Sequence, residues 1–186
     1  RTWRHLNFFQ FECYVNAHVP RVDGGPDQGV KQITVPWARP HSGFSLLMES
    51  MMMVFTRGGM TVAEAARAVG EYAQRVWTVI LHHVGVAHGR MSLEAVRVIS
   101  VDEVCRARGQ NYLTIISEPK QDGHPTRVLL VIEGRDSKTL REFKDHLHRR
   151  GLSQEQIQTI CSDMSPAYIK GIREEFGHAL LVFDYF

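Results

Sequence analysis

"VRVISVDEV" (residues 96–104) is an apolar, β-branched run that ends in two adjacent carboxylates, Asp102 and Glu103. Such a run predicts a strand that is buried on at least one face. A buried carboxylate is costly unless a positive group compensates it, so the acids at the end of this strand need an explanation. Strand alternation places the two acids on opposite faces, and we expect Glu103 to be satisfied by its neighbours or to face solvent.

Downstream of this run, strand and helix patterns alternate in the order β-β-β-α-β-α-β. Two strands at 111–119 and 126–134 follow on short connections, which makes the first three strands an antiparallel meander. The polar helix at 137–150 is a crossover, so the strand ending near Cys161 should run parallel to one of them. If it lies beside the first strand, the order is 3-2-1-4-5, in an α/β fold whose mixed sheet is incomplete at its C-terminus.

A second acid, Asp163, follows the fourth predicted strand as Asp102 ends the first. In that order the two strand ends are neighbours at the switch point where open α/β sheets bind ligands. Strands about 4.8 Å apart would bring the carboxylates close enough to repel unless they share a cation. We therefore predict a Mg²⁺ or Mn²⁺ site on Asp102 and Asp163. The alternative, that either Asp is a turn residue or helix cap, stays open.

The N-terminal 40 residues predict a small β-hairpin module. Aromatic and β-branched residues fill 8–22, "DGGPDQG" (23–29) is a strong turn signal, and "VKQITVPW" (30–37) is typical of a returning strand. We expect three domains: 1–40 as this module, 41–92 as a helical region, and 93–186 as the domain that contains the sheet.

The helical region contains the pattern of a helix-turn-helix. Thr61 and Glu64 form a capping box and Gly70 closes a short helix, after which a second helix begins. The spacing suits a DNA-binding helix-turn-helix, although many helical hairpins share it. On the second helix, Gln74, Arg75 and Thr78 lie opposite the apolar positions 76, 80 and 84 and could reach base edges in a major groove. Trp77 is expected in the core.

Composition limits the classes of protein. The 186 residues are 44% hydrophobic and 23% charged, with a net charge of +2, which permits nucleic-acid binding without requiring it. The three cysteines are far apart, which fits a reducing compartment. No run has the length of a membrane span, so we expect no membrane association.

Four stretches in this order, "VRVISVDEV", "VLLVIEGRDSKTL" (128–140), "SDMSPAYIKGI" (162–172) and "ALLVFDYF" (179–186), resemble bacterial insertion-sequence transposases of the ISL3 family. "VPWARPHSGF" (35–44) is similar to that family's N-terminal region. The resemblance implies a ribonuclease-H-like catalytic domain with a DDE triad, preceded by a zinc-binding element and a helix-turn-helix. It implies metal-dependent hydrolysis and strand transfer at transposon ends, in a bacterial cytoplasmic, nucleoid-associated protein that binds double-stranded DNA.

By that resemblance Asp102 is the first catalytic acid and Asp163 the second, with Asp184 in "VFDYF" as the runner-up for the second. The third acid, a Glu, is expected beyond residue 186, and Glu133 and Glu142 are weaker candidates. The chain starts without Met and stops inside an apolar run, so we interpret it as a piece of a longer protein with little activity alone.

The zinc-binding element departs from the family pattern. Gly24, Gly25 and Gln28 stand in the turn where the family has metal ligands, and Cys13 with His18 cannot form a tetrahedral site. We predict a zinc-ribbon remnant that binds no zinc.

Other interpretations remain open. Arg106 and Arg108, in the loop after the first strand of the sheet, would hold phosphate near the metal or lie in a solvated turn. The Met-rich segment 46–54 is expected in the core, with a homodimer surface as the second interpretation. The alternative to a transposase is a non-catalytic DNA-binding protein whose sheet is a scaffold or dimerisation domain.

Overall fold

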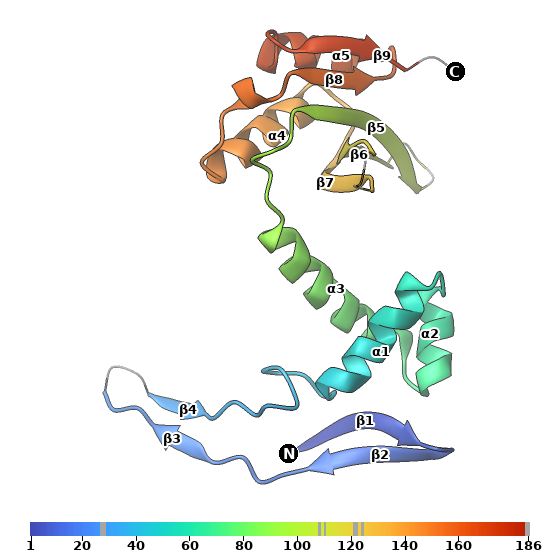
Figure 1. Cartoon of the computed structure of the whole chain (residues 1–186), viewed down its shortest axis with the longest axis vertical. Coiled ribbons are helices and arrows are strands. Elements are labelled where there is room, and N and C mark those ends of the chain that lie inside the picture. Colours follow the sequence, from blue (N-terminus) through green and yellow to red (C-terminus); the bar gives the residue numbers. More distant parts are fainter. Residues whose placement is uncertain (27–28, 108, 110, 121–122, 124, 185–186) are drawn as a thin grey trace. The chain divides into compact units, whose positions relative to one another are not determined.

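In the computed structural model (Figure 1), the chain divides into two units, Arg1–Gly89 (unit 1) and Arg90–Phe186 (unit 2). The structure describes residues 1–26, 29–107, 109, 111–120, 123 and 125–184. Each unit has its own hydrophobic core.

Unit 1 begins with two antiparallel hairpins. In the first, β1 (Thr2–Phe8) pairs with β2 (Phe11–Asn16); in the second, β3 (Arg21–Asp23) pairs with β4 (Val30–Gln32). The second hairpin flanks the predicted turn at 23–29. The aromatic run was expected to form one strand, but the chain reverses at Phe9, which has a left-handed φ of 53°. The structure therefore has two short hairpins where the sequence predicted one.

Three helices complete unit 1: α1 (Leu46–Arg57), α2 (Val62–Val69) and α3 (Ala73–Arg90). The predicted capping box is confirmed, because Thr61 Oγ1 accepts from Glu64 N and the Glu64 carboxylate accepts from Thr61 N. Gly70 ends α2 at a φ of 71°, which a residue without a Cβ adopts at little cost. The core between the helices buries Phe44, which precedes α1, together with apolar side chains from all three helices: Met48, Met52, Ala66, Val69, Val76 and Val79.

A buried carboxylate links α1 to α3. Glu49 has no solvent exposure, and its oxygens lie 2.9 Å from Arg39 Nε and 2.8 Å from His83 Nε2. The Ser42 hydroxyl donates a third hydrogen bond at 2.5 Å. Because its hydrogen-bonding capacity is met on several sides, this acid can stay buried.

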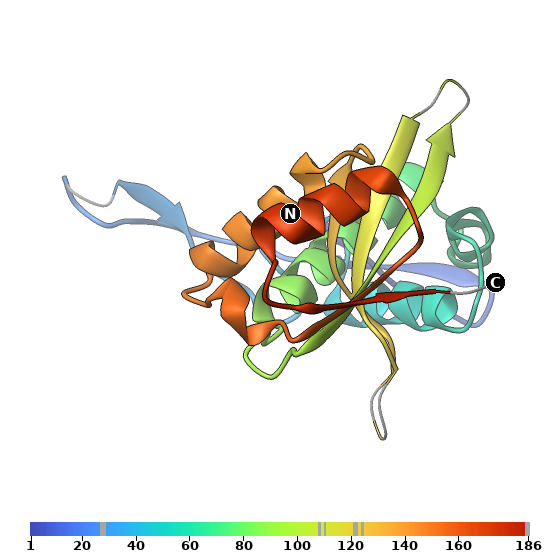
Figure 2. The same cartoon turned by 90° about the horizontal axis from the view of Figure 1, so that it is seen from above.

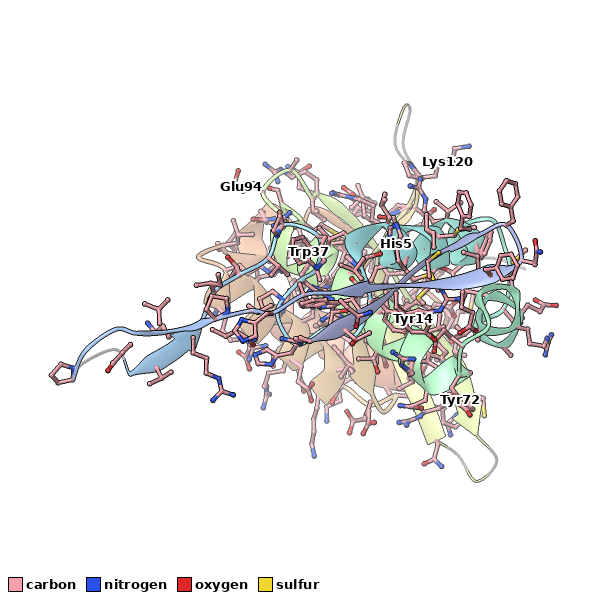
Figure 3. All side chains as sticks on the ribbon, turned by 90° about the horizontal axis from the view of Figure 1, so that it is seen from below. His5, Tyr14, Trp37, Tyr72, Glu94 and Lys120 are labelled. Carbon is pink, nitrogen blue, oxygen red and sulfur yellow. The ribbon has the colours of Figure 1, made fainter. Side chains whose placement is uncertain are left out.

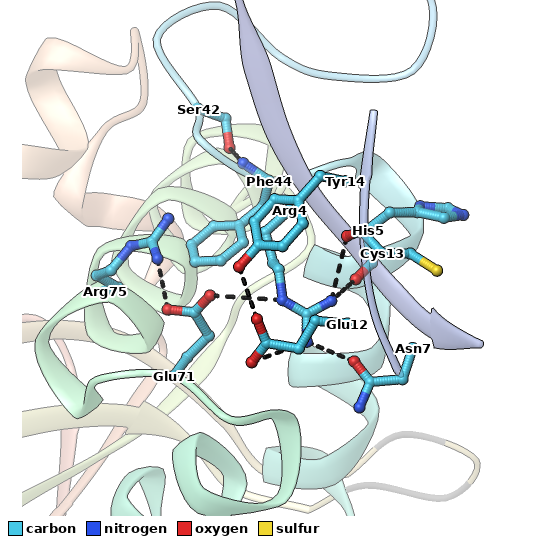
Figure 4. Close-up of polar contacts among 10 residues, drawn as sticks. All are labelled: Arg4, His5, Asn7, Glu12, Cys13, Tyr14, Ser42, Phe44, Glu71 and Arg75. Carbon is cyan, nitrogen blue, oxygen red and sulfur yellow. Dashed lines mark hydrogen bonds and ion pairs between the residues drawn. The ribbon is translucent and has the colours of Figure 1, made fainter. Parts of the chain in front are cut away.

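Arg4 plays the corresponding part between the first hairpin and the α2–α3 connection (Figure 4). The residue is 2% exposed, and its guanidinium lies 3.9 Å from Glu12 and 4.0 Å from Glu71. It also donates to the backbone carbonyl of Cys13 at 3.3 Å and lies over the Tyr14 ring, 5.4 Å from the centroid. These contacts hold β1 and β2 against the helices.

Unit 2 is a five-stranded mixed sheet with the strand order β7-β6-β5-β8-β9. Its central strand β5 pairs antiparallel with β6 and parallel with β8, and β8 pairs parallel with β9. The strands are β5 (Val98–Ala107), β6 (Asn111–Glu118), β7 (Arg127–Glu133), β8 (Thr159–Ser162) and β9 (Leu180–Phe183).

Two helices, α4 (Lys138–Arg149) and α5 (Pro166–Glu175), pack on one face of this sheet (Figure 2). A short 3-10 helix, η1 (Gln154–Gln156), lies between α4 and β8. The core of the unit joins alternate strand residues such as Ile99, Val101 and Ile160 to Phe143 and Phe176 of the helices. The intervening strand residues point to the other face, which we call the open face.

α4 and α5 approach each other closely. A Cβ built on Gly171 would lie 2.8 Å from the backbone oxygen of Ser137. Hydrogen bonds from Lys144 and Arg141 lower the pKa of the Glu175 carboxyl below its ordinary value. This ion pair therefore contributes stability above about pH 4.5 that is lost as the pH falls.

None of the described helices has the length and apolar character needed to span a membrane.

Candidate functional site

The register of β5 and β8 places Asp102 and Asp163 on the same face of the sheet. The last register pair of these strands is Val101–Ser162, both buried under the helices, and each Asp is the next residue of its chain segment. By alternation both carboxylates point to the open face. Asp102 lies within β5, and Asp163 is the first residue beyond the end of β8.

Asp184 continues the same row. β9 pairs with β8 through Ser162–Phe183, and Asp184 N donates to Ser162 O at 3.1 Å. Asp184 therefore lies one strand beyond Asp163, on the open face. The sequence ranked Asp184 as the runner-up to Asp163; its place beside the other two acids depends on the register of β9 against β8.

Tyr168 of α5 is buried and interacts electrostatically with carboxylates from both faces of the sheet. Burial raises the pKa of its phenol above the ordinary value of 10.0, and three carboxylates raise it further, those of Glu103, Asp163 and Asp102. The hydrogen bond between its hydroxyl and Thr114 Oγ1, 2.9 Å long, acts in the opposite direction. The phenol therefore stays protonated at neutral pH and adds no negative charge.

Both acids also make local hydrogen bonds. Asp102 Oδ1 accepts from Glu103 N at 2.7 Å, and Asp163 Oδ1 accepts from Ser165 N, just before α5, at 3.0 Å. These contacts match the turn-residue interpretation and leave further carboxylate lone pairs. Among the residues that the structure describes, no group of three or more His, Cys, Asp or Glu is arranged to hold a metal ion. Two hard oxygen donors on one face fit part of a Mg²⁺ or Mn²⁺ site, with water and phosphate as the remaining ligands.

The row that precedes the acids on the open face contains Ser100 and Cys161, which are paired in register. Burial raises the pKa of the Cys161 thiol, and the nearby Asp184 carboxylate raises it further, while a hydrogen bond with Ser100 lowers it. The thiol is therefore neutral at pH 7, so the negative charge of this face comes from the aspartates.

Arg106 lies further along β5. It follows Asp102 by four residues, about 13 Å along a strand, and its Nη1 is 2.8 Å from Glu133 Oε1. Both side chains are more than half exposed. Its predicted partner in phosphate binding, Arg108, lies outside the described residues.

The three predicted base-contacting residues lie at the start of α3, and all are exposed. Arg75 Nη1 is 2.5 Å from Glu71 Oε2, and the guanidinium lies over the Phe44 ring, 4.2 Å from its centroid. The Thr78 hydroxyl donates to the backbone oxygen of Gln74 at 3.0 Å. Arg75 is thus held against its own unit, whereas Gln74 takes part in the last of these contacts only through its backbone oxygen.

The apolar face of α3 differs from the prediction. Val76 and Val79 are buried, but Trp77 is 46% exposed and Val84 is 52% exposed, so the expectation of a core Trp77 was wrong. Trp77 is one position away from the buried Val76, which turns its side chain about 100° around the helix. Tyr72, just before α3, is also exposed (Figure 3).

Two family models match successive parts of the chain. One, described as "Helix-turn-helix domain of transposase family ISL3", matches residues 33–84. The other, described as "Transposase", is a DDE model of the same family and matches residues 99–186. The first covers α1, α2 and most of α3, and the second includes Asp102 and Asp163.

Curated relatives agree with these models. The "Transposase for insertion sequence element IS1557" is 29% identical over 153 residues in two strains of Mycobacterium tuberculosis, CDC 1551 / Oshkosh and ATCC 25618 / H37Rv. The match covers 79% of this chain and 32% of each relative, so the chain spans about a third of their length.

A solved structure overlaps more weakly. It is the "CryoEM structure of simian T-cell lymphotropic virus intasome in complex with PP2A regulatory subunit B56 gamma", at 10% identity and a TM-score of 0.32. The overlap covers 72% of this chain and 51% of that chain. A TM-score of this size does not establish a shared fold.

Proposed function

Because this chain belongs to the ISL3 family of insertion-sequence transposases, we propose that it supplies the DNA-binding helices and much of the catalytic sheet of a DDE transposase. The reaction we propose is metal-dependent hydrolysis and strand transfer at transposon ends, on double-stranded DNA in the bacterial cytoplasm. The five-stranded sheet, in this proposal, is the ribonuclease-H-like core.

The observation that carries the proposal is the shared face of Asp102 and Asp163. The two residues are far apart in the sequence but follow one register pair of neighbouring strands. Like charges at neighbouring strand ends repel unless a cation lies between them, so this placement supports a metal-binding role for the two carboxylates.

In the proposed mechanism, Asp102 and Asp163 would hold the divalent ion through carboxylate oxygens. A bound ion would supply activation of the attacking hydroxyl and stabilisation of the leaving oxygen of the phosphodiester. The hydrogen bond from Ser165 N orients the Asp163 carboxylate. We assign the third acid to none of the described residues; the Glu133 carboxylate is already paired with Arg106.

DNA recognition is assigned to α3. Gln74 is exposed near the N-terminus of this helix, where a recognition helix contacts base edges. Arg75 and Thr78 contribute contacts next to it in this proposal. The formation of a homodimer by this chain remains a prediction.

Metal binding tests the catalytic assignment. We expect the wild-type chain to bind Mn²⁺, measured by electron paramagnetic resonance of the free ion, and expect Asp102→Asn and Asp163→Asn each to weaken binding at least tenfold. Asp145→Asn removes the same charge from the exposed surface of α4 and should leave the affinity unchanged. Far-ultraviolet circular dichroism of each variant controls for folding.

Equal and negligible binding by the wild type and both variants would overturn the metal assignment. It would favour the second candidate function, a DNA-binding protein whose sheet is a scaffold. The local hydrogen bonds of both aspartates, and the lack of a three-ligand group among the described residues, are the observations on that side.

A further inference from the structure

Unit 1 contains a cavity of about 290 Å³ between the segment 31–41 and β1. That volume is at the lower end of the range of ligand pockets, about 300–1,000 Å³. Its lining includes four side chains that carry or can carry positive charge: Arg1, Lys31, Arg39 and His41. None of the described residues that line it is acidic.

The positive side chains of this cavity differ in their partners. Arg39 is paired with the buried Glu49. The Arg1 guanidinium, in contrast, donates to two neutral acceptors, Gln32 Oε1 and Ser42 O, each at 3.2 Å. The Arg1 charge is therefore offset by no carboxylate in these two contacts, which favours an anion beside it.

Two further observations point to a ligand. His41 has a left-handed φ of 61°, an unusual conformation for a residue with a Cβ. Trp3, which lines the same cavity, has a buried Nε1 with no hydrogen-bond partner among the described residues. Buried donors are normally satisfied, so a ligand or water is needed beside it.

Two residues of this cavity also line a second cavity at the proposed recognition helix. Arg39 and His41 also line a second cavity of about 150 Å³, together with Gly43, Arg75 and Thr78. Arg75 fits tightly there, because a Cβ on Gly43 would lie 3.1 Å from Arg75 Nη2. Basic side chains therefore line both cavities, from Lys31 in the first to Arg75 in the second.

We propose that this basic cavity binds a backbone phosphate of duplex DNA beside the base pairs that α3 reads. The inference rests on the proposed DNA-binding function and adds a second, sequence-independent contact to it. A phosphate anchor of this kind fixes the register of a recognition helix without reading bases. It also makes the affinity depend on salt, because each neutralised phosphate releases counterions.

The test compares duplex binding of the full chain at a series of salt concentrations, by fluorescence anisotropy, on DNA that carries the ends of the element and on unrelated DNA. We expect Lys31→Gln to weaken binding to both duplexes equally and to reduce the slope of log K against log salt by about 1. His41→Asn removes the imidazole from the cavity and should also weaken binding to both duplexes equally. Asn tolerates a left-handed φ, so the fold is kept. Arg57→Gln removes one charge from the end of α1, outside both cavities, and should leave the slope unchanged.

The outcomes separate this inference from the proposed function. If Gln74→Ala relaxes sequence preference but Lys31→Gln behaves like Arg57→Gln, DNA recognition by α3 stands and the phosphate anchor is refuted. If the wild type shows no salt-dependent duplex binding, both are refuted. The alternative ligand is a free anion, which is tested by titration with inorganic pyrophosphate. If Lys31→Gln weakens pyrophosphate binding but leaves the duplex affinity unchanged, the proposal is also overturned.

Discussion

Glu49 shows how much depends on one side chain in unit 1. It is fully buried, and Arg39 and His83 lie within 3 Å of its oxygens. We expect Glu49→Ala to lower the free energy of unfolding of unit 1 by about 3–5 kcal/mol, because both partners lose a buried carboxylate. Tryptophan fluorescence during urea denaturation measures it, since Trp3, Trp37 and Trp77 all belong to this unit.

Ser50, which is exposed and follows Glu49 on α1, provides the control for this substitution within the same unit. Ser50→Ala should change the free energy of unfolding of unit 1 by no more than about 0.5 kcal/mol. A Glu49→Ala variant as stable as Ser50→Ala would mean that the network around Glu49 contributes nothing.

Single residues also show which expectations a sequence can support. Thr61, Glu64 and Gly70 were predicted correctly because their interactions span only a few positions of the chain. The exposure of Trp77 was not, because it depends on which side of α3 the other helices cover. The reversal at Phe9 has no glycine or asparagine to signal it.

At the scale of elements, the contact between α4 and α5 depends on Gly171. A methyl group there would meet the backbone of Ser137 at 2.8 Å, and backbone cannot rotate away. We expect Gly171→Ala to destabilise unit 2 by about 1–3 kcal/mol, by forcing the helices apart. Amide hydrogen exchange in α4 and α5 measures the change.

Gly85 is the matched control, because it lies within α3 and a Cβ there would meet nothing within 4 Å. Gly85→Ala should stabilise the helix by about 0.5–1 kcal/mol. If Gly→Ala destabilises at position 171 and stabilises at position 85, the cost at Gly171 comes from the contact between the helices. A change in stability of the same sign at both positions would contradict this explanation.

Elements with a clear period were predicted well, and long-range placement less so. The helix at 137–150, the helix after Ser165 and the strand patterns of unit 2 all appear in the structure as helices and strands. The face on which Asp184 lies depends on the register of β9 against β8, which no local pattern specifies. The basic cavity joins β1 to residues 31–41 and was likewise not visible in the sequence.

At the scale of the whole molecule, the two proposed activities belong to different units. Gln74→Ala should reduce discrimination between duplexes by about 1–3 kcal/mol and leave Mn²⁺ affinity unchanged. Asp163→Asn should weaken Mn²⁺ binding and leave the discrimination between duplexes unchanged. Duplex binding of this variant is measured in the presence of a chelator. Loss of both activities in either variant, with folding intact by circular dichroism, would argue against this division.

The row formed by Asp102, Asp163 and Asp184 has a consequence for the order of assembly. DNA is a polyanion, so its approach to this face is opposed until a cation reduces the local charge. Occupancy by the ion and by the nucleic acid would then be cooperative, and thermodynamic reciprocity requires each to raise the affinity for the other by the same factor. Such a protein would carry out no strand cleavage when divalent ions are scarce.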